Sequence, residues 1–232
     1  MKTVLITGGI SGLGKSIAEQ YILNGYKVFV TSHSFSISSS NVILIPLDLT
    51  SSSSIIEFIN TAEKIIDKLD VFISNAGVLI PETISEMKPV SLEKMIAINL
   101  SSPLLLTQWV CKKMRRDGHI LFVSSIASIV SKPTSVTYSA VKSAITGIVK
   151  SLALDLSSRN ILVNSISPGP IDSDMVNRLV PENERANIVN SIPLKRLAKP
   201  DEIAKVIYFL CSKDNTYLTG QNVIVDGGFT CR

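Results

Sequence analysis

Residues 3–14 read TVLITGGISGLG, an apolar run that passes directly into a turn containing Gly8, Gly12 and Gly14. Apolar residues at helical spacing follow over residues 16–24, so the segment predicts a strand, a glycine turn and a helix. Glycines at such a junction let a pyrophosphate approach the free N–H groups of the helix's first turn. The spacing differs from the GxGxxG pattern, and ordinary strand-to-helix turns also use glycine. The position after the first strand is what favours a dinucleotide site.

Strand-like and helix-like segments alternate along the rest of the chain. Strands are expected at 27–31, 42–47, 71–74, 119–124, 162–167 and 223–226, and helices at 53–66, 91–114, 137–158 and 201–212. No linker or internal repeat divides the 232 residues. The pattern predicts a single-domain α/β protein with a Rossmann-type doubly wound parallel sheet over residues 1–232. Ligands of such sheets bind beyond the carboxyl ends of the strands.

Composition argues against several classes of protein. Hydrophobic residues make up 45% of the chain and charged residues 18%, a balance typical of buried parallel strands. The net charge of +4 is scattered, which argues against a nucleic-acid binder, and no apolar run approaches the roughly 20 residues of a membrane span. Three distant cysteines and two histidines, His33 and His119, predict neither disulfides nor a metal site. We therefore expect a cytoplasmic protein without metal, nucleic acid or membrane as partners.

Tyr138 and Lys142 are four residues apart on an expected helix and therefore share one face. An ammonium group beside a phenol favours the phenolate, so we expect Lys142 to lower the pKa of Tyr138 and make it a general acid or base. Such a pair alone is more often ordinary helix surface. Ser125, at the end of the preceding strand, and Asn99, in an otherwise apolar helix, turn it into a candidate catalytic site.

Along essentially its whole length the chain resembles the short-chain dehydrogenase/reductase family. The resemblance rests on the glycine motif and on Asp48, Ser74-Asn75-Ala76-Gly77, Asn99, Ser125, Tyr138-Ser-Ala-Val-Lys142, Pro168-Gly169 and Val225-Asp226-Gly227-Gly228. It implies hydride transfer between a nicotinamide cofactor and a carbonyl or secondary alcohol. By this resemblance Tyr138 would donate the proton and Ser125 would polarise the carbonyl. Lys142 would hold the nicotinamide ribose, and Asn99 would anchor a water that relays protons to Lys142.

The resemblance also implies the residues that contact the cofactor. Besides Tyr138 and Lys142 these are Gly8, Ser11, Gly12, Leu13, Gly14, Ser32, His33, Asp48, Leu49, Asn75, Ala76, Gly77, Pro168, Gly169, Ile171 and Ser173. NADP(H) is expected over NAD(H), because no acidic residue follows the strand at 27–31, where one would bind the ribose 2′-OH of NAD. NAD(H) remains possible, since the arginine that often binds the 2′-phosphate is also missing there.

Three features depart from the family's pattern or vary within it. Only the serine-rich stretch 32–40 separates the second and third strands, where the family usually has a helix, so the adenosine end of the cleft is expected to be more open. Ala198 replaces a common glycine, with no functional consequence expected. The stretch 174–191, rich in breakers and polar residues, is expected to be a mobile substrate loop that orders when ligands bind.

Within the family the chain is most similar to 3-oxoacyl-acyl-carrier-protein reductases. A sugar or secondary-alcohol dehydrogenase and a catalytically silent dinucleotide-binding regulatory protein remain alternatives. A homotetramer, or at least a dimer, is expected, with helices 91–114 and 137–158 and the C-terminal residues 223–232 in the interfaces. The basic cluster Lys112, Lys113, Arg115 and Arg116 is either a solvated helix end or a docking site for an acidic partner such as acyl carrier protein.

Overall fold

A seven-stranded sheet forms the centre of the protein in the computed structural model. The structure describes residues 1–32 and 42–231, apart from the side chains of Met175 and Asn177. All neighbouring strands pair in parallel, in the order β3-β2-β1-β4-β5-β6-β7. The strands are β1 (Thr3–Thr7), β2 (Lys27–Ser32), β3 (Val42–Pro46), β4 (Leu69–Ser74), β5 (Met114–Val123), β6 (Leu162–Pro168) and β7 (Asn222–Val225).

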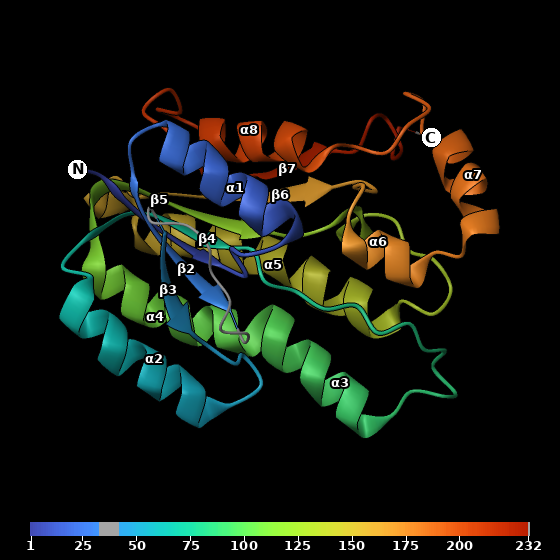
Figure 1. Cartoon of the computed structure of the whole chain (residues 1–232), viewed down its shortest axis with the longest axis horizontal. Helices are drawn as coiled ribbons and strands as arrows, with labels where there is room; N and C mark the ends of the chain where they lie inside the picture. Colours follow the sequence, from blue (N-terminus) through green and yellow to red (C-terminus); the bar gives the residue numbers. More distant parts are fainter. Residues whose placement is uncertain (33–41, 232) are drawn as a thin grey trace.

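Helices cover both faces of the sheet, as Figure 1 shows. The α-helices are α1 (Gly12–Leu23), α2 (Ser52–Ile65), α3 (Pro89–Ile96), α4 (Ser102–Lys113), α5 (Val136–Asp155), α6 (Asp174–Leu179), α7 (Glu182–Ser191) and α8 (Pro200–Leu210). Three short turns are η1 (Ala97–Ser101), η2 (Ile126–Ser128) and η3 (Ser157–Arg159). The expected single-domain α/β fold with a Rossmann-type doubly wound parallel sheet is confirmed.

Two hydrophobic clusters hold the layers together. On one face α1 and α8 pack on the sheet, with Tyr21 and Ile207 fully buried. On the other face α2, α4 and α5 pack, and Trp109 lies there against the Phe58 ring while its Nε1 donates to Glu63 Oε1 at 2.7 Å. Trp109 is therefore a core residue. Burial of both sheet faces explains the nearly continuous apolar runs of the strands.

The strand order reverses between β1 and β4, because successive strands run outward from β1 in one direction and from β4 in the other. Loops that leave neighbouring strands at such a point diverge to opposite faces and leave a crevice for a ligand. All strands are parallel, so their carboxyl ends lie along one edge of the sheet. Gly8, Asn75, Ser125 and Gly169, which were singled out from the sequence, lie just beyond these ends and so along the same edge.

Three predicted elements differ in the structure. The helix expected over 91–114 is split into α3 and α4 by the π-turn η1, and β5 begins at Met114 rather than at His119. The stretch 174–191, expected as a loop, forms α6 and α7 instead.

The helices α6 and α7 are explained by charges that the loop expectation overlooked. Pro181 ends one helix and precedes the next, and Glu182 and Glu184 occupy the first turn of α7, where the helix dipole favours acidic side chains. Arg185 Nε lies 3.2 Å from Glu182 Oε2. The role of this segment at the substrate stays a prediction.

Candidate functional site

The glycine turn between β1 and α1 is packed too closely for side chains. A Cβ built on Gly14 would overlap the carbonyl oxygen of Gly8 and lie 2.7 Å from Asn75 Nδ2. Gly8 itself has φ +66°, a left-handed conformation that favours glycine. The first turn of α1 is therefore held directly against the end of β1, with no side chain between the helix N-terminus and the crevice.

Asn75 connects this turn to β4. Its backbone N–H donates to Thr7 Oγ1 at 3.0 Å, and its Nδ2 donates to the carbonyls of Thr7 at 2.9 Å and Gly8 at 3.2 Å. Ala76 N–H also donates to Thr7 Oγ1, at 3.0 Å. These bonds fix the two central strands to each other at their carboxyl ends, where the strand order reverses.

At the start of α1 the N-cap residue Ser11 has an extended backbone and makes no side-chain capping bond. The amide groups of Gly12, Leu13 and Gly14 belong to the first turn, which has no hydrogen-bond partners within the helix. Such amides, together with the helix dipole, attract anions. The structure thus places Ser11, Gly12, Leu13 and Gly14 at the N-terminus of α1, and phosphate binding there stays a prediction.

Tyr138 and Lys142 lie one turn apart near the start of α5. Lys142 is 3% exposed, its Nζ donates to the carbonyl of Val123 at 2.9 Å, and Nζ lies 5.6 Å from the centre of the Tyr138 ring. Burial lowers the pKa of Lys142 to about 8. Burial also raises the pKa of Tyr138 to about 12, opposed by a hydrogen bond with Ser125. The expectation that Lys142 lowers the pKa of Tyr138 is wrong for this structure, because desolvation disfavours the charged form of both groups.

Ser125 lies two residues after the end of β5 and caps the 3-10 turn η2. Its Oγ accepts the N–H of Ala127 at 3.2 Å. The same hydroxyl is hydrogen-bonded to Tyr138, which opposes the rise in the pKa of that phenol. The neighbouring Ser124 Oγ donates to the carbonyl of Lys142 at 3.0 Å. This bond ties α5 to the end of β5, so the structure brings Ser125, Tyr138 and Lys142 together.

Asn99 sits at the centre of the π-turn η1 and is 2% exposed. Its Nδ2 donates to the carbonyls of Met95 and Val78, both at 2.9 Å, and its Oδ1 accepts Val78 N–H at 3.2 Å. A Cβ built on Gly77 would lie 3.0 Å from Asn99 Oδ1 and 3.4 Å from Lys142 Nζ. Asn99 and Lys142 therefore both lie beside Gly77, and the single-turn π-bulge, a feature common at functional sites, brings Asn99 there.

The other predicted cofactor residues lie at the ends of β2 and β3. Ser32 ends β2 and is buried, and its carbonyl accepts Leu47 N–H at 2.9 Å. Asp48 is exposed, and its Oδ1 accepts hydrogen bonds from Thr50 N–H at 2.8 Å and Thr50 Oγ1 at 2.7 Å. Leu49 is buried beside them. His33 and the rest of the serine-rich stretch lie outside the described residues, and so does the expectation of a more open adenosine end.

Pro168 is the last residue of β6 and Gly169 follows it. The chain then passes along the segment that contains Ala198. Ile171 pairs with Ala198 as an isolated bridge, in which Ala198 N–H donates to Pro170 at 3.0 Å and Asp172 N–H donates to Ala198 at 2.9 Å. Ala198 takes part only through its backbone. Ser173 Oγ lies 3.4 Å from the carbonyl of Ile171, at the N-cap of α6.

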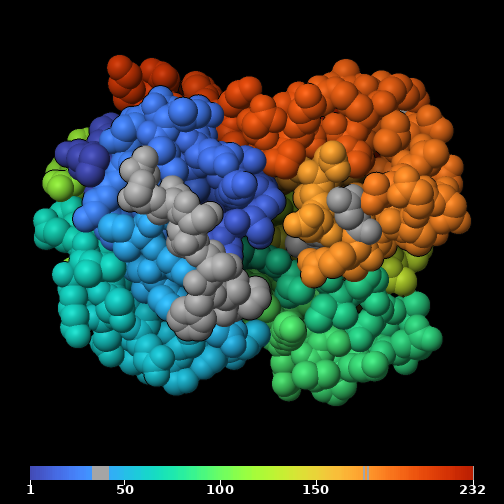
Figure 2. Space-filling view, in the orientation of Figure 1, coloured from blue at the N-terminus to red at the C-terminus, as the bar shows by residue number. Residues whose placement is uncertain are grey.

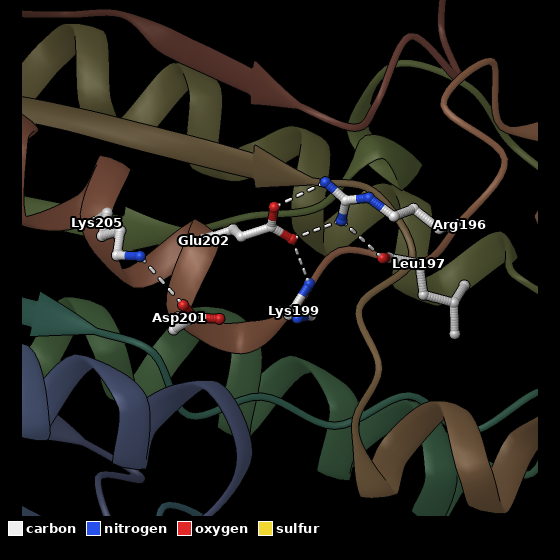
Figure 3. Close-up of polar contacts among 6 residues, drawn as sticks. All are labelled: Arg196, Leu197, Lys199, Asp201, Glu202 and Lys205. Atoms are coloured by element: carbon white, nitrogen blue, oxygen red, sulfur yellow. Dashed lines mark hydrogen bonds and ion pairs between the residues drawn. The ribbon is translucent and has the colours of Figure 1, made fainter.

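An ion pair fixes the segment around Ala198 to the start of α8. Arg196 and Glu202 form two nearly parallel bonds, of 2.7 and 2.8 Å, and Glu202 also accepts Lys199 N–H at 2.8 Å (Figure 3). These partners lower the pKa of Glu202 to about 2, the side-chain bond with Arg196 contributing most. The bidentate pair therefore links the chain just before Ala198 to the first turn of α8.

Figure 2 shows the surface hollowed between the blue α1 region and the orange segment that follows β6. The glycine turn and the end of β6 border this region along the carboxyl edge of the sheet. Across the described residues, no helix combines the length and apolar character needed to span a bilayer.

A family model described as enoyl-(acyl carrier protein) reductase matches residues 8–230. A crystal structure of a short-chain dehydrogenase family protein from Francisella tularensis superimposes with a TM-score of 0.95, covering 100% of both chains at 29% identity. The chain belongs to the short-chain dehydrogenase/reductase family.

Other members of the short-chain dehydrogenase/reductase family are similar along nearly the whole chain. The 3-oxoacyl-[acyl-carrier-protein] reductase FabG of Aquifex aeolicus is 31% identical, covering 98% of this chain and 96% of that protein. The FabG of Rickettsia prowazekii is 36% identical with the same coverage. A blue fluorescent protein from a metagenomic library, solved in complex with NADPH, has a TM-score of 0.89 at 28% identity, covering 99% of this chain and 98% of that one.

Sequence reasoning missed several polar residues around this short-chain dehydrogenase/reductase site. Thr7 joins Asn75 and Ala76 to β1, and its position as the last strand residue before the glycines was an available signal. The bonds of Ser128 and of Asn222 could not be inferred, because they join residues far apart in the chain.

Proposed function

We propose that this chain is an NADP(H)-dependent reductase of 3-oxoacyl thioesters that works in the cytoplasm. The observation that carries the proposal is the grouping of Ser125, Tyr138 and Lys142 at the carboxyl edge of the sheet, beside the glycine turn. The identity of 31–36% to curated 3-oxoacyl-acyl-carrier-protein reductases supports the substrate class. The NADPH complex of a similar structure supports the cofactor.

The residues along the crevice fit a dinucleotide. Gly8 and Gly14 leave the first turn of α1 bare, and its free amides can bind a pyrophosphate. When bound, the nicotinamide supplies the hydride for the carbonyl carbon. We assign cofactor contacts to Gly8, Ser11, Gly12, Leu13, Gly14, Ser32, His33, Asp48, Leu49, Asn75, Ala76, Gly77, Tyr138, Lys142, Pro168, Gly169, Ile171 and Ser173.

In the proposed reaction the chain's own residues bind the carbonyl oxygen and move a proton. Ser125 donates its hydroxyl hydrogen to the carbonyl oxygen, in place of its hydrogen bond with Tyr138, and polarises the C=O bond. Tyr138 donates its proton to the same oxygen as negative charge develops there, which a phenol with a pKa near 12 does only as the oxygen becomes strongly basic. Lys142, beside the Tyr138 ring, holds the nicotinamide ribose. Asn99 anchors a water that relays protons to Lys142.

Acyl carrier protein is a proposed partner, but the basic cluster at residues 112–116 does not suit its docking. Lys113 Nζ lies 2.6 Å from Glu63 Oε2 and Arg115 Nε lies 3.7 Å from Asp70 Oδ1, so half of the cluster is neutralised. The cluster also lies at the start of β5, whereas Ser125 lies beyond the opposite end of that strand. Ten strand residues span roughly 30 Å, which favours a solvated end of the molecule for the cluster.

The proposal is tested by following NADPH oxidation with acetoacetyl thioester, crotonyl thioester, keto-sugars and simple ketones. We expect the highest kcat/KM with acetoacetyl thioester. Preference for crotonyl thioester would replace the proposal with enoyl reduction, the activity in the description of the matching family model. Preference for a sugar or simple ketone would support the dehydrogenase alternative. Cofactor binding without turnover on any substrate would support a silent regulatory protein.

NADPH is expected to give a higher kcat/KM than NADH, by a modest factor. No carboxylate ends β2 to repel the 2′-phosphate, and Ser32 stands there instead. Replacing Ser32 by aspartate should shift the preference towards NADH, because a carboxylate binds the 2′-OH and repels the phosphate. Kinetics with both cofactors measure this, with Ser32→Asn as an uncharged control of equal size. A wild type that favours NADH would refute the assignment at β2 and leave the catalytic one intact.

The protein is proposed to be a homotetramer, or at least a dimer, paired through α3, α4 and α5. An apolar cavity of about 320 Å³ opens between α3, η1 and α5, and its lining residues are Met87, Leu92, Ile96, Leu100, Val136, Thr137, Ala140 and Val141. Leu105 on α4 is 48% exposed and Val136 on α5 is 52% exposed. The stretch 223–232, whose last residue lies outside the described part, is proposed as a second contact.

Light scattering at micromolar concentration should therefore give a multiple of the 25.1 kDa chain mass. Replacing Leu105 by glutamate should lower that mass, because a charge in an apolar interface loses its hydration. Replacing Ile56 by glutamate is the matched control, since Ile56 is 60% exposed on α2, outside the proposed interface. A wild-type monomer would contradict the proposal.

A further inference from the structure

The beginning of α5 carries Tyr138 but lacks the usual side-chain cap. Ser135 is the N-cap residue, and its buried hydroxyl has no hydrogen-bond partner among the described residues. Tyr138 lies in the first turn that follows. Helix ends open more readily than helix centres, and a capping side chain is what normally stabilises the first turn. The position of Tyr138 therefore depends on contacts from other segments.

The loop between β4 and α3 supplies those contacts. Glu82 N–H donates to the carbonyl of Thr134 at 3.1 Å, and Glu82 and Ser135 form an isolated parallel bridge. Further along the loop, Met87 Sδ accepts a hydrogen bond from Thr137 Oγ1 at 3.1 Å. Figure 1 shows this loop passing beside α5 before it reaches α3. One loop thus holds both the residue before the N-cap and the first turn itself.

Thr134, which accepts the bond from Glu82, has a strained backbone. Its φ of +64° lies in the left-handed region. A β-branched residue is rare there, because its side chain crowds the backbone. Such strain persists only where neighbouring contacts hold it, and it is concentrated at functional sites. The bond from Glu82 N–H is one such contact, and it lies directly before α5.

The carboxylate of Glu82 fixes the shape of the same loop. Oε1 accepts the hydroxyl of Ser91 at 2.8 Å, and Oε2 accepts the N–H of Lys88 at 3.2 Å. Lys88 is the N-cap residue of α3, and its own side chain makes no capping bond. A negative charge at this end of a helix is favoured by the helix dipole. Glu82 therefore joins two helix starts, since its side chain bonds the beginning of α3 and its backbone N–H bonds the residue before α5.

We propose that Glu82 is a positioning residue for Tyr138: its carboxylate folds the loop against α3, and the loop in turn holds the first turn of α5. The inference rests on the catalytic role of Tyr138 in the proposed function. Lys142 is held separately, because its Nζ bonds the Val123 carbonyl and its own carbonyl accepts Ser124 Oγ. Loss of the Glu82 carboxylate should thus displace the Tyr138 hydroxyl and leave Lys142 in place.

The test replaces Glu82 by alanine and, separately, by glutamine. Glu82→Ala should lower kcat by roughly 10- to 100-fold, because a small misplacement of a catalytic group has effects of this size, and should leave the Kd for NADPH unchanged. Glutamine has an oxygen for Lys88 N–H and an NH₂ group for the Ser91 hydroxyl oxygen, so Glu82→Gln should keep most of the wild-type kcat. Wild-type kcat in Glu82→Ala would overturn the proposal.

Glu86→Ala is the matched control in the same loop. Glu86 Oε2 accepts the Thr83 hydroxyl at 2.7 Å, a bond that lies within the loop and reaches neither α3 nor α5. This variant should keep the wild-type kcat. An equal loss in Glu86→Ala and Glu82→Ala would overturn the assignment to Glu82, because any loosening of the loop would then be sufficient.

A second background separates positioning from a loss of folded protein. In Tyr138→Phe the hydroxyl that Glu82 positions is already missing, so adding Glu82→Ala should leave the residual kcat unchanged. A purely structural role would lower kcat by the same factor in the wild-type and Tyr138→Phe backgrounds, and that result would overturn the proposal.

Hydrogen exchange separates this inference from the proposed function, because it needs no turnover. Ser139 N–H donates to the Ser135 carbonyl at 2.8 Å, a bond that closes the first turn of α5. In Glu82→Ala this amide should exchange at least about tenfold faster. An unchanged rate would overturn the inference whatever the enzyme reduces. If the wild type reduces no carbonyl compound while the exchange of Ser139 quickens, the proposed function fails and the link from Glu82 to α5 stands.

Discussion

Replacing Tyr138 by phenylalanine should remove nearly all turnover and leave cofactor binding intact. The ring and its packing near Lys142 remain, and only the hydroxyl that we propose exchanges a proton with the substrate is lost. General acid catalysis of this kind typically contributes on the order of 10²–10⁴-fold, so kcat should fall by about that factor. The measurement is kcat at saturating NADPH, together with the Kd for NADPH from fluorescence titration.

Tyr217→Phe is the matched control for this change, because Tyr217 is 95% exposed and its hydroxyl lies outside the site. It should keep the wild-type kcat. A Tyr138→Phe enzyme that retains more than about a tenth of the wild-type rate would refute proton donation by Tyr138. Weakened cofactor binding in that variant would show instead that the hydroxyl mainly holds the cofactor.

Replacing Gly14 by alanine should weaken NADPH binding by at least about 100-fold. The added Cβ would overlap the carbonyl oxygen of Gly8, so the first turn of α1 must move away from the end of β1. That movement displaces the amides that we propose bind the pyrophosphate, and it strains the bonds between Asn75 and the turn. Titration of the variant with NADPH measures the loss, and circular dichroism checks that the sheet remains folded.

Gly147→Ala gives the matched control on α5. A Cβ at Gly147 meets no atom within 4 Å, so the same chemical change should leave the Kd for NADPH unchanged and favour the helix slightly. Wild-type affinity in Gly14→Ala would contradict the assignment of the glycine turn to the pyrophosphate. Loss of affinity in both variants would point to a general effect on the fold.

The candidate site could be predicted in part because its residues follow strands. Gly8, Asn75, Ser125 and Pro168 each come directly after an expected strand, and parallel strands end along the same edge. Tyr138 and Lys142 could be paired from their helical spacing alone. The protonation behaviour of that pair could not, because it depends on burial by segments distant in sequence.

Two predictions from local sequence were wrong, because long-range partners or the placement of charges decide the structure there. The breaker-rich stretch 174–191 forms two helices, since Pro181 and the acidic residues after it favour a helix start. The helix expected over 91–114 contains a π-turn, in which Asn99 bonds backbone groups of Met95 and Val78. The spacing of apolar residues predicts which face of a helix is buried. It does not predict which backbone carbonyl a buried side-chain amide will bond.

The sequence by itself determined the α/β class, the parallel sheet, the glycine turn and the identity of the proposed catalytic residues. These features depend on contacts between residues a few positions apart or on the spacing of apolar side chains, and both can be inferred from the sequence. Three further features depend on the tertiary structure alone. These are the pKa directions of Tyr138 and Lys142, the positions of Asn99 and Lys142 beside Gly77, and the hydrogen bonds that join Ser128, Ser167 and Asn222. Each of these depends on desolvation or on hydrogen bonds between distant segments, which exist only once the sheet has brought those segments together.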